Sequence, residues 1–449
     1  MIKHIIVGTG LSSLAAVLSL VSKNNKPTVI DIGINKIKDN KVLKSDYSKL
    51  PYLNDFKYLF ESFGDKSIRK NTEVLKSIGY GGLSNIWGGS ICKVHKKDFK
   101  NWPIEYDEIN KYYKKLDKHF RFDGFDDLYS KEFNLKKINK NTPNFFLNES
   151  ELLKEGIYFG NPRNILGKSK KILNSKEYFN ELIKSKKINY IKNMKVQNYI
   201  EKKKFVEINC VNIRTKKKLT FKCKKLLLGC GAFQTSKILF NSEKISRLKL
   251  RETKLIPSVW FVKDKIKKNH KLTFLFNITY LNRFKFHSQV YKIDMDLFKK
   301  LESNLPILKF FPGIVKKFIM NNFLIIFTYI NQNNSNELIL RKKKQKTYLK
   351  KKTKILYSYS NIKSLITRIF SNQIKNIFSL TSFKFGYGYH FGSSLPMSGS
   401  RKMNNSDHLG RPFGKKRIHI IDSSILPEIP VNTISYTVMA NAYRIADNL

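Results

Sequence analysis

Residues 5–31 read IIVGTGLSSLAAVLSLVSKNNKPTVID, and this stretch decides the fold that we expect. The apolar run 5–7 predicts a short buried strand, and the β-branched run 28–30 predicts a second one. Between them, a glycine-rich turn leads into a helix rich in Ala and Leu. Strand, turn, helix and strand in this order indicate a dinucleotide-binding βαβ unit.

Four residues of this unit have the types that a dinucleotide requires. Gly8 permits the tight turn, and Gly10 lets the backbone approach a pyrophosphate at the positive end of the helix dipole. Ser13 occupies the third position of the fingerprint and is small enough for close helix–strand packing. Asp31 ends the second strand and would accept hydrogen bonds from an adenosine ribose. The alternative is an ordinary βαβ unit with glycine in its turn.

The composition sets limits on the class of protein. A chain of 449 residues with 41% hydrophobic content can bury a large core, and this length favours two domains. The net charge is +52, with Lys far more frequent than Arg. Because the basic residues are spread over the whole chain, we favour compositional drift over a nucleic-acid partner. Peripheral contact with an anionic membrane stays open as an alternative.

The cysteines and the first residues of the chain indicate the cellular compartment that we expect. Cys92, Cys210, Cys223 and Cys230 include no CxxC pair and no metal-ligand spacing, so we expect free buried thiols in a reducing compartment and no metal site. A strand begins almost at once, which leaves no room for a signal peptide before it. No apolar run reaches the roughly 18 residues that span a bilayer. We therefore expect a cytoplasmic protein, with a membrane-peripheral location as the alternative.

Two glycine-rich segments follow along the chain. Residues 79–90, GYGGLSNIWGGS, predict a loop whose backbone lies against something flat or anionic, or else a turn under a packed Trp87. Residues 187–228 predict short strands, and the last of them runs into the motif LLLGCGAFQTSKILF. This second junction of strand, glycine and helix would return the chain to the nucleotide sheet.

A different pattern covers residues 251–384. Alternating apolar and polar segments predict a largely antiparallel sheet, interrupted by helix around residues 295–320. The densest basic run, RKKKQKTYLKKKTK at 341–354, predicts a solvated hairpin.

The last 65 residues, from 385 to 449, place one histidine, His390, in a glycine-rich context at 386–397. A strand at 417–421 then ends in Asp422. Asn432 is expected to be the N-cap of a helix at 434–447. His408 and His419 lack a comparable setting and are interpreted as surface or structural residues.

Six segments occur in an order that resembles the glucose–methanol–choline (GMC) family of flavoprotein oxidoreductases, and the resemblance runs nearly end to end. They are GTGLSS with Asp31, GGLSNIWGG, NWPIEYDEINKYY, LLLGCGAFQTSKILF, HFGSSLPM and DSSILPEIPVNTISYTVMANAYRIAD. The resemblance implies an α/β (mixed α+β) fold in which a Rossmann-type FAD-binding domain carries a substrate domain built on a largely antiparallel sheet. The implied FAD-binding parts are 1–120, 187–250 and 385–449, with a substrate or cap segment at 121–186 and the substrate domain at 251–384.

The resemblance also implies a catalytic pair. His390 stands where the family has its catalytic histidine, which takes the proton of a substrate alcohol while the carbon hydride passes to flavin N5. The family's second catalytic position holds His or Asn. An ungapped count puts Thr433 there, with Asn432 one residue earlier, and we assign Asn432. A second departure is that Gly392 lies two residues after the histidine, whereas the family's glycine lies three after, where this chain has Ser393.

The residues expected to contact FAD lie in the matched motifs, except Val196, which lies in the strand region at 187–228. They are Gly8, Gly10, Ser13, Asp31, Gly82, Ser84, Asn85, Trp87, Gly88, Val196, Gly231, Asp422 and Thr433. Some family members tether FAD through a histidine in the GGxSxxW loop. This chain has Ile86 there, so the expected FAD is noncovalent.

Three functions remain to be distinguished. The first is an FAD-dependent alcohol dehydrogenase or oxidase acting on a small hydroxylated substrate such as a sugar or polyol, with an unknown electron acceptor. The second is a nicotinamide-dependent reductase, which leaves the C-terminal motifs unexplained. The third is a non-enzymatic binder of nucleic acid or membrane that depends on the +52 charge.

Overall fold

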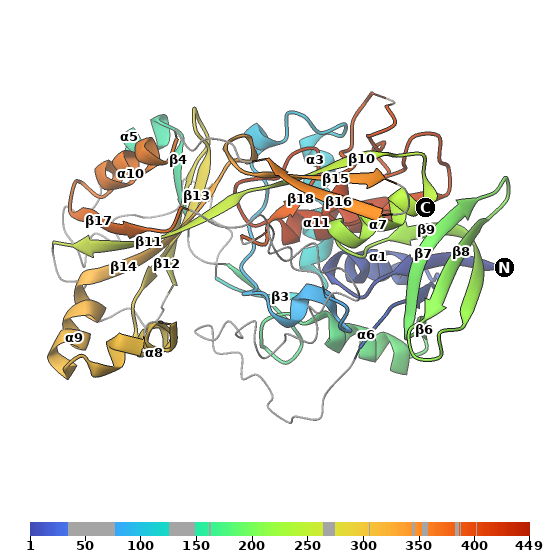
Figure 1. The fold of residues 1–449 in the computed structure, drawn as a ribbon, viewed down its shortest axis with the longest axis horizontal. Helices are drawn as coiled ribbons and strands as arrows, with labels where there is room; N and C mark the ends of the chain where they lie inside the picture. Colours follow the sequence, from blue (N-terminus) through green and yellow to red (C-terminus); the bar gives the residue numbers. More distant parts are fainter. Residues whose placement is uncertain are drawn as a thin grey trace.

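The computed structural model describes residues 1–34, 77–124, 149–160, 163–263, 274–304, 306–343, 346–352, 358–381, 386, 388–400 and 402–449. These residues form two lobes, and both chain ends lie in the larger one (Figure 1).

A seven-stranded sheet organises the larger lobe, in the order β6-β2-β1-β9-β8-β7, with β19 also paired to β9. The expected βαβ unit is present, because β1 and β2 pair in parallel with Ile6 opposite Val29. Strand β9 also pairs in parallel with β1, so the second glycine junction does return the chain to this sheet. The strands are β1 (Ile2–Val7), β2 (Thr28–Ile30), β6 (Asn189–Ile191), β7 (Met194–Glu201), β8 (Val206–Asn212), β9 (Lys218–Leu228) and β19 (Ile418–Ile420).

Helix α1 lies in the centre of this lobe. Its residues from Ser12 to Leu20 are all buried, as expected for a helix that is apolar on every side. It packs against α11, which in turn packs against α3. The helices of this lobe are α1 (Leu11–Ser22), α3 (Tyr106–Asp117), α6 (Ser175–Lys184), α7 (Ala232–Ser242) and α11 (Ser435–Asp447).

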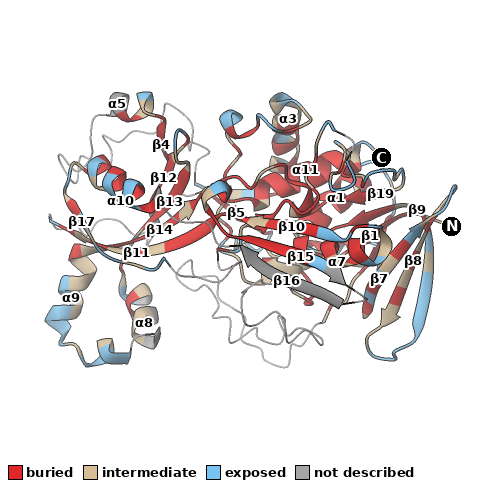
Figure 2. Ribbon diagram, turned by 45° about the horizontal axis from the view of Figure 1, so that its top comes forward, coloured by how far each residue is buried: buried red, intermediate tan, exposed pale blue. Residues whose placement is uncertain are grey.

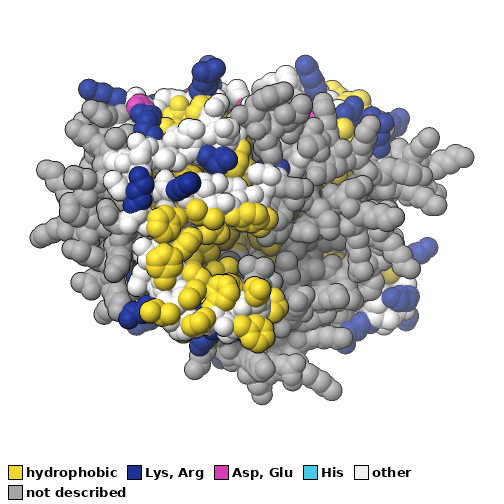
Figure 3. All heavy atoms as spheres, turned by 60° about the vertical axis from the view of Figure 1, so that its left-hand side comes forward, with side chains coloured by type: hydrophobic (Ala, Val, Ile, Leu, Met, Phe, Trp, Pro, Cys, Tyr) yellow, Lys and Arg dark blue, Asp and Glu magenta, His cyan; other side chains and the backbone are white. Residues whose placement is uncertain are grey.

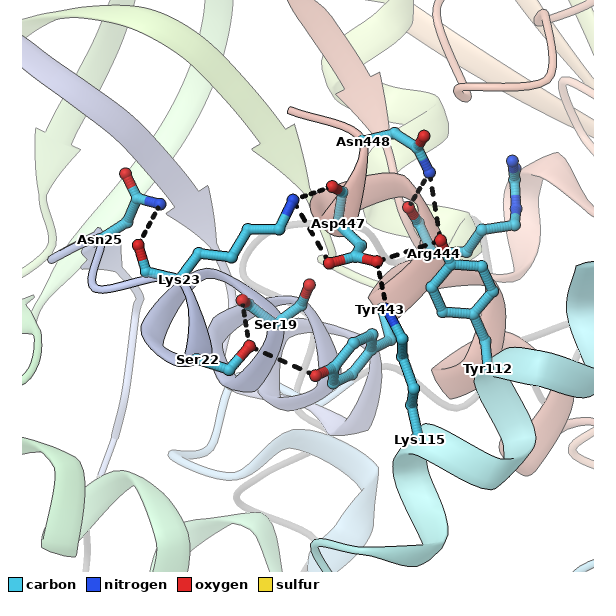
Figure 4. Close-up of polar contacts among 10 residues, drawn as sticks. All are labelled: Ser19, Ser22, Lys23, Asn25, Tyr112, Lys115, Tyr443, Arg444, Asp447 and Asn448. Carbon is cyan, nitrogen blue, oxygen red and sulfur yellow. Dashed lines mark hydrogen bonds and ion pairs between the residues drawn. The ribbon is translucent and has the colours of Figure 1, made fainter.

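One carboxylate joins the two ends of the chain (Figure 4). Asp447, at the end of α11, accepts hydrogen bonds from Lys115 Nζ at 2.5 Å and from the Tyr112 hydroxyl at 3.1 Å, both on α3. Lys23, directly after α1, lies 3.3 Å from the same carboxylate. Asp447 thereby ties the end of α11 to α3 and to the residue that follows α1.

A smaller antiparallel sheet covers the same core in the order β16-β15-β10-β18. Leu248, Leu250, Leu338 and Leu340 of this sheet belong to the hydrophobic core of the larger lobe. The hairpin expected within 341–354 is confirmed, since Lys343 pairs with Lys346. The strands are β10 (Arg247–Glu252), β15 (Glu337–Lys343), β16 (Lys346–Lys352) and β18 (Phe391–Gly392).

The second lobe is a six-stranded antiparallel sheet in the order β17-β11-β14-β13-β12-β4, as the alternation in 251–384 predicts. Helix α10 covers one face, where Trp260, Ile326 and Ile366 belong to one core. Helices α8 and α9 lie at one end of the opposite face (Figures 1 and 2). The elements are β4 (Ile157–Gly160), β11 (Lys254–Val262), β12 (Phe274–Tyr280), β13 (Phe286–Lys292), β14 (Phe323–Ile330), β17 (Ile374–Ser379), α5 (Glu149–Lys154), α8 (Met295–Asn304), α9 (Gly313–Asn322) and α10 (Ser358–Ile369).

Short elements complete the described chain. They are the pair β3 (Arg121–Asp123) and β5 (Asn164–Leu166), and the 3-10 turns η2 (Gly82–Asn85), η3 (Lys96–Asp98), η4 (Pro306–Phe310), η5 (Gln332–Asn334) and η6 (Ser423–Ile425). Within the described ranges, no helix is long and apolar enough to cross a membrane.

The N-cap expected at Asn432 is wrong. Helix α11 begins at Ser435, its N-cap residue is Ile434, and no side chain caps it. The reason is that the Asn432 side chain is used elsewhere, since its Nδ2 donates a hydrogen bond to the Lys93 carbonyl at 2.8 Å.

Candidate active site

The turn after β1 requires glycine at position 8. Gly8 has a φ of +101°, and a Cβ built on it would lie 2.7 Å from the Gly229 carbonyl oxygen. Its N–H donates to the Ile30 carbonyl at 2.9 Å. Ser13 is fully buried beneath this turn and donates to the Gly229 carbonyl at 3.4 Å. The close packing expected of Gly8 and Ser13 is therefore present.

Gly10 and Gly231 border open space. A Cβ built on either of them meets no described atom within 4 Å. Both follow the carboxyl ends of adjacent parallel strands, and each directly precedes a helix, α1 or α7. Unpaired N–H groups and a positive helix dipole end at such a place suit an anion. The room beside these glycines thus fits the pyrophosphate of a dinucleotide.

Asp31 lies at the end of β2. Its carboxylate accepts a hydrogen bond from Thr9 Oγ1 at 2.5 Å. Burial raises the pKa of Asp31 to about 7, although the Thr9 hydroxyl and the N–H groups of Ile32 and Gly33 favour the charged form. A partly buried carboxyl at this position can accept hydrogen bonds from ribose hydroxyls.

The loop at 79–90 lies directly on the glycine turn. A Cβ on Gly82 would be 3.1 Å from Gly10 Cα, and Gly81 N–H donates to Thr9 Oγ1 at 2.9 Å. Close approach of two backbones explains why this loop is rich in glycine.

Two side chains of this loop bond within it, and a third ties it to Leu173. Ser84 Oγ donates to the Gly81 carbonyl at 2.6 Å, and Asn85 Nδ2 donates to the Gly82 carbonyl at 2.7 Å. Trp87 Nε1 donates to the Leu173 carbonyl at 2.6 Å. Contacts of Ser84, Asn85, Trp87 and the exposed Gly88 with a cofactor stay predictions.

Asp422 connects the second glycine junction, at Gly231, to the C-terminal segment. It is buried and accepts hydrogen bonds from Thr235 Oγ1 at 2.5 Å, from Ser424 N–H at 2.9 Å and from Gly231 N–H. Burial raises the pKa of Asp422. Val196, the remaining candidate, is a buried core residue of β7, and its contact with FAD stays a prediction.

His390 is held against the segment that carries Asp422. Its carbonyl accepts the Thr253 N–H at 3.0 Å, and the next two residues form β18 against β10. A Cβ on Gly392 would lie 2.2 Å from the Ser423 carbonyl oxygen, so only glycine fits there. The backbone that follows the histidine is therefore packed, through Gly392 and Ser423, on the segment that carries Asp422.

Ser393 lies three residues after His390, at the position where the GMC resemblance implies a glycine. Ser393 has a φ of +55°, a left-handed conformation that favours glycine. Arg251 Nη1 donates to its Oγ at 3.1 Å, and Ser393 Oγ donates to the Pro427 carbonyl at 3.3 Å. These two bonds hold the serine in its left-handed conformation.

The His390 side chain comes from the larger lobe but packs on the smaller one. Its imidazole stacks on the ring of Tyr329, with centroids 4.5 Å apart and planes 18° apart. His390 Nδ1 is buried and has no hydrogen-bond partner among the described residues. Burial lowers the pKa of His390 to about 4, so its imidazole is neutral near pH 7 and able to accept a proton.

A second histidine, His287, was missed by the sequence analysis. It is fully buried on β13, directly opposite Tyr329 on β14, with ring centroids 6.4 Å apart. Its Nδ1 shares a 2.8 Å hydrogen bond with Thr279 Oγ1, and its Nε2 has no partner within the described ranges. Burial, and then the nearby His390, lower the pKa of His287 to about 3. The available signal was a histidine inside an alternating strand, KFHSQVYKI.

Other buried polar side chains surround His287 on the same face of the sheet. Asn277 pairs with Gln289, and Thr279 pairs with His287, across β12 and β13. All four side chains are buried. Asn277 Oδ1 has no hydrogen-bond partner in the part of the chain that the structure describes. Polar atoms without partners are costly inside a protein, so they mark a place where a polar ligand fits.

Asn432 and Thr433 are both buried next to the start of α11. Asn432 is tied to the Lys93 carbonyl, whereas the Thr433 hydroxyl is buried without a partner among the described residues. Asn432 as the second catalytic residue and Thr433 as a contact of FAD stay predictions.

The described residues contain no group of three His, Cys, Asp or Glu side chains that could hold a metal ion. All four cysteines are free, and Cys92, Cys210 and Cys223 are buried.

Comparison with solved structures shows the fold. Pyridoxine 4-oxidase from Mesorbium loti matches with a TM-score of 0.64 and 10% identity, over 100% of this chain and 99% of that one. A formate oxidase matches with a TM-score of 0.64 and 13% identity, over 99% and 97%. A variant formate oxidase from Aspergillus oryzae, described for its FAD modification, matches with a TM-score of 0.62 and 13% identity, also over 99% and 97%. No family model and no curated protein sequence matches this chain. The fold is that of the GMC oxidoreductases.

Proposed function

We propose that this chain, which has the GMC oxidoreductase fold, is an FAD-dependent enzyme that oxidises the CH–OH group of a sugar, polyol or related alcohol. One observation carries the proposal. His390 is neutral near pH 7, its Nδ1 has no partner among the described residues, and its ring stacks on Tyr329, which lies opposite the buried His287. The segment that follows His390 packs through Gly392 on Ser423, next to Asp422. The solved structures of the same fold are oxidases, and one of them was studied for modification of its FAD, which supports the reaction class.

The cradle formed by Gly10, Gly231 and Asp422 fits FAD. Gly10 and Gly231 would lie against the pyrophosphate, and Asp31 would bind the adenosine ribose. Bound FAD would supply the hydride acceptor for the substrate carbon. Ile86 occupies the position where a tethering histidine would stand, so the cofactor is held noncovalently. Acid precipitation should release the flavin into the supernatant, and flavin that stays in the pellet would contradict this.

His390 acts as the base in this proposal. Its pKa, lowered to about 4, keeps the imidazole neutral at physiological pH, where it can accept the hydroxyl proton of the substrate. The stacked ring of Tyr329 holds the imidazole in one orientation. Proton removal from the hydroxyl raises the electron density on the adjacent carbon and so favours departure of its hydride.

The polar face of the second lobe provides the substrate contacts. His287 Nε2 and Asn277 Oδ1 are buried polar atoms without partners among the described residues. Hydroxyl groups can donate to and accept from such atoms, which supports a substrate with several hydroxyls over a simple aliphatic alcohol.

The test is an anaerobic screen of the purified yellow protein against sugars, polyols and simple alcohols, with flavin absorbance as the readout. We expect bleaching by a polyhydroxylated compound. His390→Ala should keep the flavin but slow bleaching by roughly a hundredfold or more. His408→Ala is the matched control, because His408 is exposed in the larger lobe, and it should bleach at the parent rate.

Three results would contradict the proposal. A colourless protein would favour a nicotinamide-dependent or non-enzymatic role, and unchanged kinetics in His390→Ala would remove His390 from the mechanism. The third concerns the substrate class. His287→Leu should weaken substrate binding while the flavin remains bound, and an unchanged apparent affinity for the bleaching compound would exclude His287 as a substrate contact.

A further inference from the structure

An exposed apolar face lies at the outer end of the second lobe, where η4, α9 and β17 come together. We call it the η4–α9 face. Its members are Ile307 (67% exposed), Phe310 (84%), Ile314 (79%), Phe318 (52%) and Phe378 (53%). Large apolar side chains so exposed, and so close together, mark a surface that binds something.

Helix α9 presents this face to solvent because its other side packs against a small hydrophobic core. Ile319 and Met320 pack against the small core that contains Phe298 and Ile325. Ile314 and Phe318 lie four residues apart and so share the outward side of the helix. Figure 2 shows α9 as intermediate or exposed over most of its length, and only its last residue, Asn322, is buried.

The face continues from the helix onto the sheet. Phe318 contacts Phe261 of β11 with ring centroids 6.5 Å apart. On the neighbouring strand β17, Phe378 pairs with Val259 of β11. Figure 3 shows hydrophobic side chains gathered in one continuous area of this side of the molecule, bordered by Lys and Arg.

The charge around the face is positive. Lys309 and Lys317 are exposed within η4 and α9, and Lys263 and Lys375 are exposed at the adjoining ends of β11 and β17. Glu302, the nearest acid along the chain, is neutralised by Lys316 at 2.7 Å. Between Glu302 and Asp407 the sequence has a single acidic residue, Glu337, which is buried.

We propose that the η4–α9 face docks on the surface of an anionic lipid bilayer. Phenylalanine and isoleucine side chains would enter the boundary between headgroups and acyl chains, while the surrounding lysines contact the lipid phosphates. A second copy of this chain is the less suitable occupant. Two copies joined through this face would bring its lysines together, in molecules that each carry a net charge of +52.

Docking through this face leaves the candidate active site clear of the membrane. Phe323 at the start of β14 contacts Phe318, whereas Tyr329 near its end stacks on His390. Six residues of extended strand separate the two positions by about 20 Å. Substitutions on the face therefore do not touch the proposed catalytic residues.

The experiment uses the full chain with its flavin and vesicle flotation. Vesicles contain either phosphatidylcholine alone or phosphatidylcholine with one quarter phosphatidylglycerol. We expect the parent protein to float with the anionic vesicles and to be released as salt rises. Phe310→Ser with Ile314→Ser should lower the partition coefficient by roughly tenfold or more, because two exposed anchors are lost.

Two further variants separate apolar docking from general charge attraction. Ile200→Ser with Phe413→Ser changes two side chains of the larger lobe with exposures of 44% and 50%, and it should bind like the parent. Lys309→Gln with Lys317→Gln should weaken binding mainly at low salt. All three variants should retain the parent rate of flavin reduction in solution.

Several outcomes would overturn the proposal. They are a parent protein that ignores anionic vesicles, a Phe310/Ile314 variant that binds them as the parent does, and equal losses in the Ile200/Phe413 control. A parent dimer that dissociates in the Phe310/Ile314 variant would assign the face to a second copy. None of these results bears on the enzymatic assignment, which is measured without lipid.

Discussion

The imidazole of His390 lies nearly parallel to the phenol ring of Tyr329, 4.5 Å from it. His390 directly precedes β18 of the larger lobe, whereas Tyr329 belongs to β14, a central strand of the second lobe. The proposed base is thus oriented by the domain that is expected to bind the substrate. Any change in how the two lobes pack would move the base relative to the cradle.

Replacing Tyr329 should test this orientation. Tyr329→Phe keeps the stacked ring and should retain most of the rate of flavin reduction at saturating substrate. Tyr329→Leu removes the ring and should slow that rate by about tenfold to a hundredfold, because a misplaced base costs reactivity. Flavin content should be unchanged in both. Equal rates for the two variants would mean that the stack does not position His390.

The pH dependence of flavin reduction should report the environment of His390. Burial lowers its pKa to about 4, below the usual 6.5, so the neutral base persists into acid. The rate should therefore stay level from neutral pH down to about pH 5 and fall only below it. Stopped-flow reduction over a pH series measures this. An acid limb centred near the ordinary histidine value would show that solvent reaches the imidazole in the working enzyme.

Substitution of Gly8 should lower the stability of the fold, whereas substitution of Gly10 should prevent flavin binding. Gly8→Ala forces a Cβ against the Gly229 carbonyl at positive φ, so it should lower the free energy of unfolding by about 1–3 kcal/mol. Gly10→Leu meets open space and should leave the fold intact but abolish flavin retention, because its side chain fills the pyrophosphate position. Thermal unfolding and the ratio of flavin to protein absorbance distinguish the two. A Gly10→Leu protein that stays fully yellow would contradict the assigned cradle.

Asn432 and Thr433 are the two candidates for the second catalytic residue. Asn432 is fully buried and tethers its loop to Lys93, so Asn432→Ala should slow substrate-driven flavin reduction more than Thr433→Val does. Both proteins should remain yellow. If Thr433→Val is the more damaging change, the ungapped alignment is right and Asn432 is a structural residue. If neither change matters, this loop does not take part in the reaction.

Acid should destabilise the fold through its buried histidines. His419 is fully buried, its Nδ1 lies 3.0 Å from the Leu409 carbonyl, and burial lowers its pKa to about 4. Between about pH 4 and pH 6.5 the unfolded chain binds the proton and the folded chain does not. Stability therefore falls as the pH drops from 6.5 towards 4, by roughly 3 kcal/mol at most from this residue.

Chemical denaturation at several pH values measures that effect. Ordinary exposed carboxylates stay mostly ionised between about pH 5 and pH 6.5, but Asp31, with a pKa raised to about 7, titrates there with the opposite sign. The contribution of His419 is therefore the difference in slope between the parent and a His419 variant. His419→Gln should flatten the dependence there, and His408→Gln, at an exposed position, should leave it unchanged. Equal slopes in the parent and His419→Gln would mean that His419 does not contribute.

The sequence by itself determined the elements and several site residues, because these depend on neighbours along the chain. Alternation of apolar and polar residues predicted β11, β13 and β14, and the basic run at 341–354 predicted a hairpin. The roles of Gly8 and Ser13 followed from one βαβ unit, where the turn and the first helical turn are contiguous.

Only the tertiary structure decided what lies across from each of these elements. His287 became a site residue because the pairing of β13 with β14 sets it opposite Tyr329, which stacks on His390. Asn432 does not cap the helix because its side-chain amide donates a hydrogen bond to the carbonyl of Lys93, 339 positions earlier. Ile314 and Phe318 have the spacing of a core stripe, yet the neighbouring side of α9 covers the small core and leaves them in solvent. Periodicity gives a residue its side of a helix or strand, but the packing of distant segments decides which side is buried.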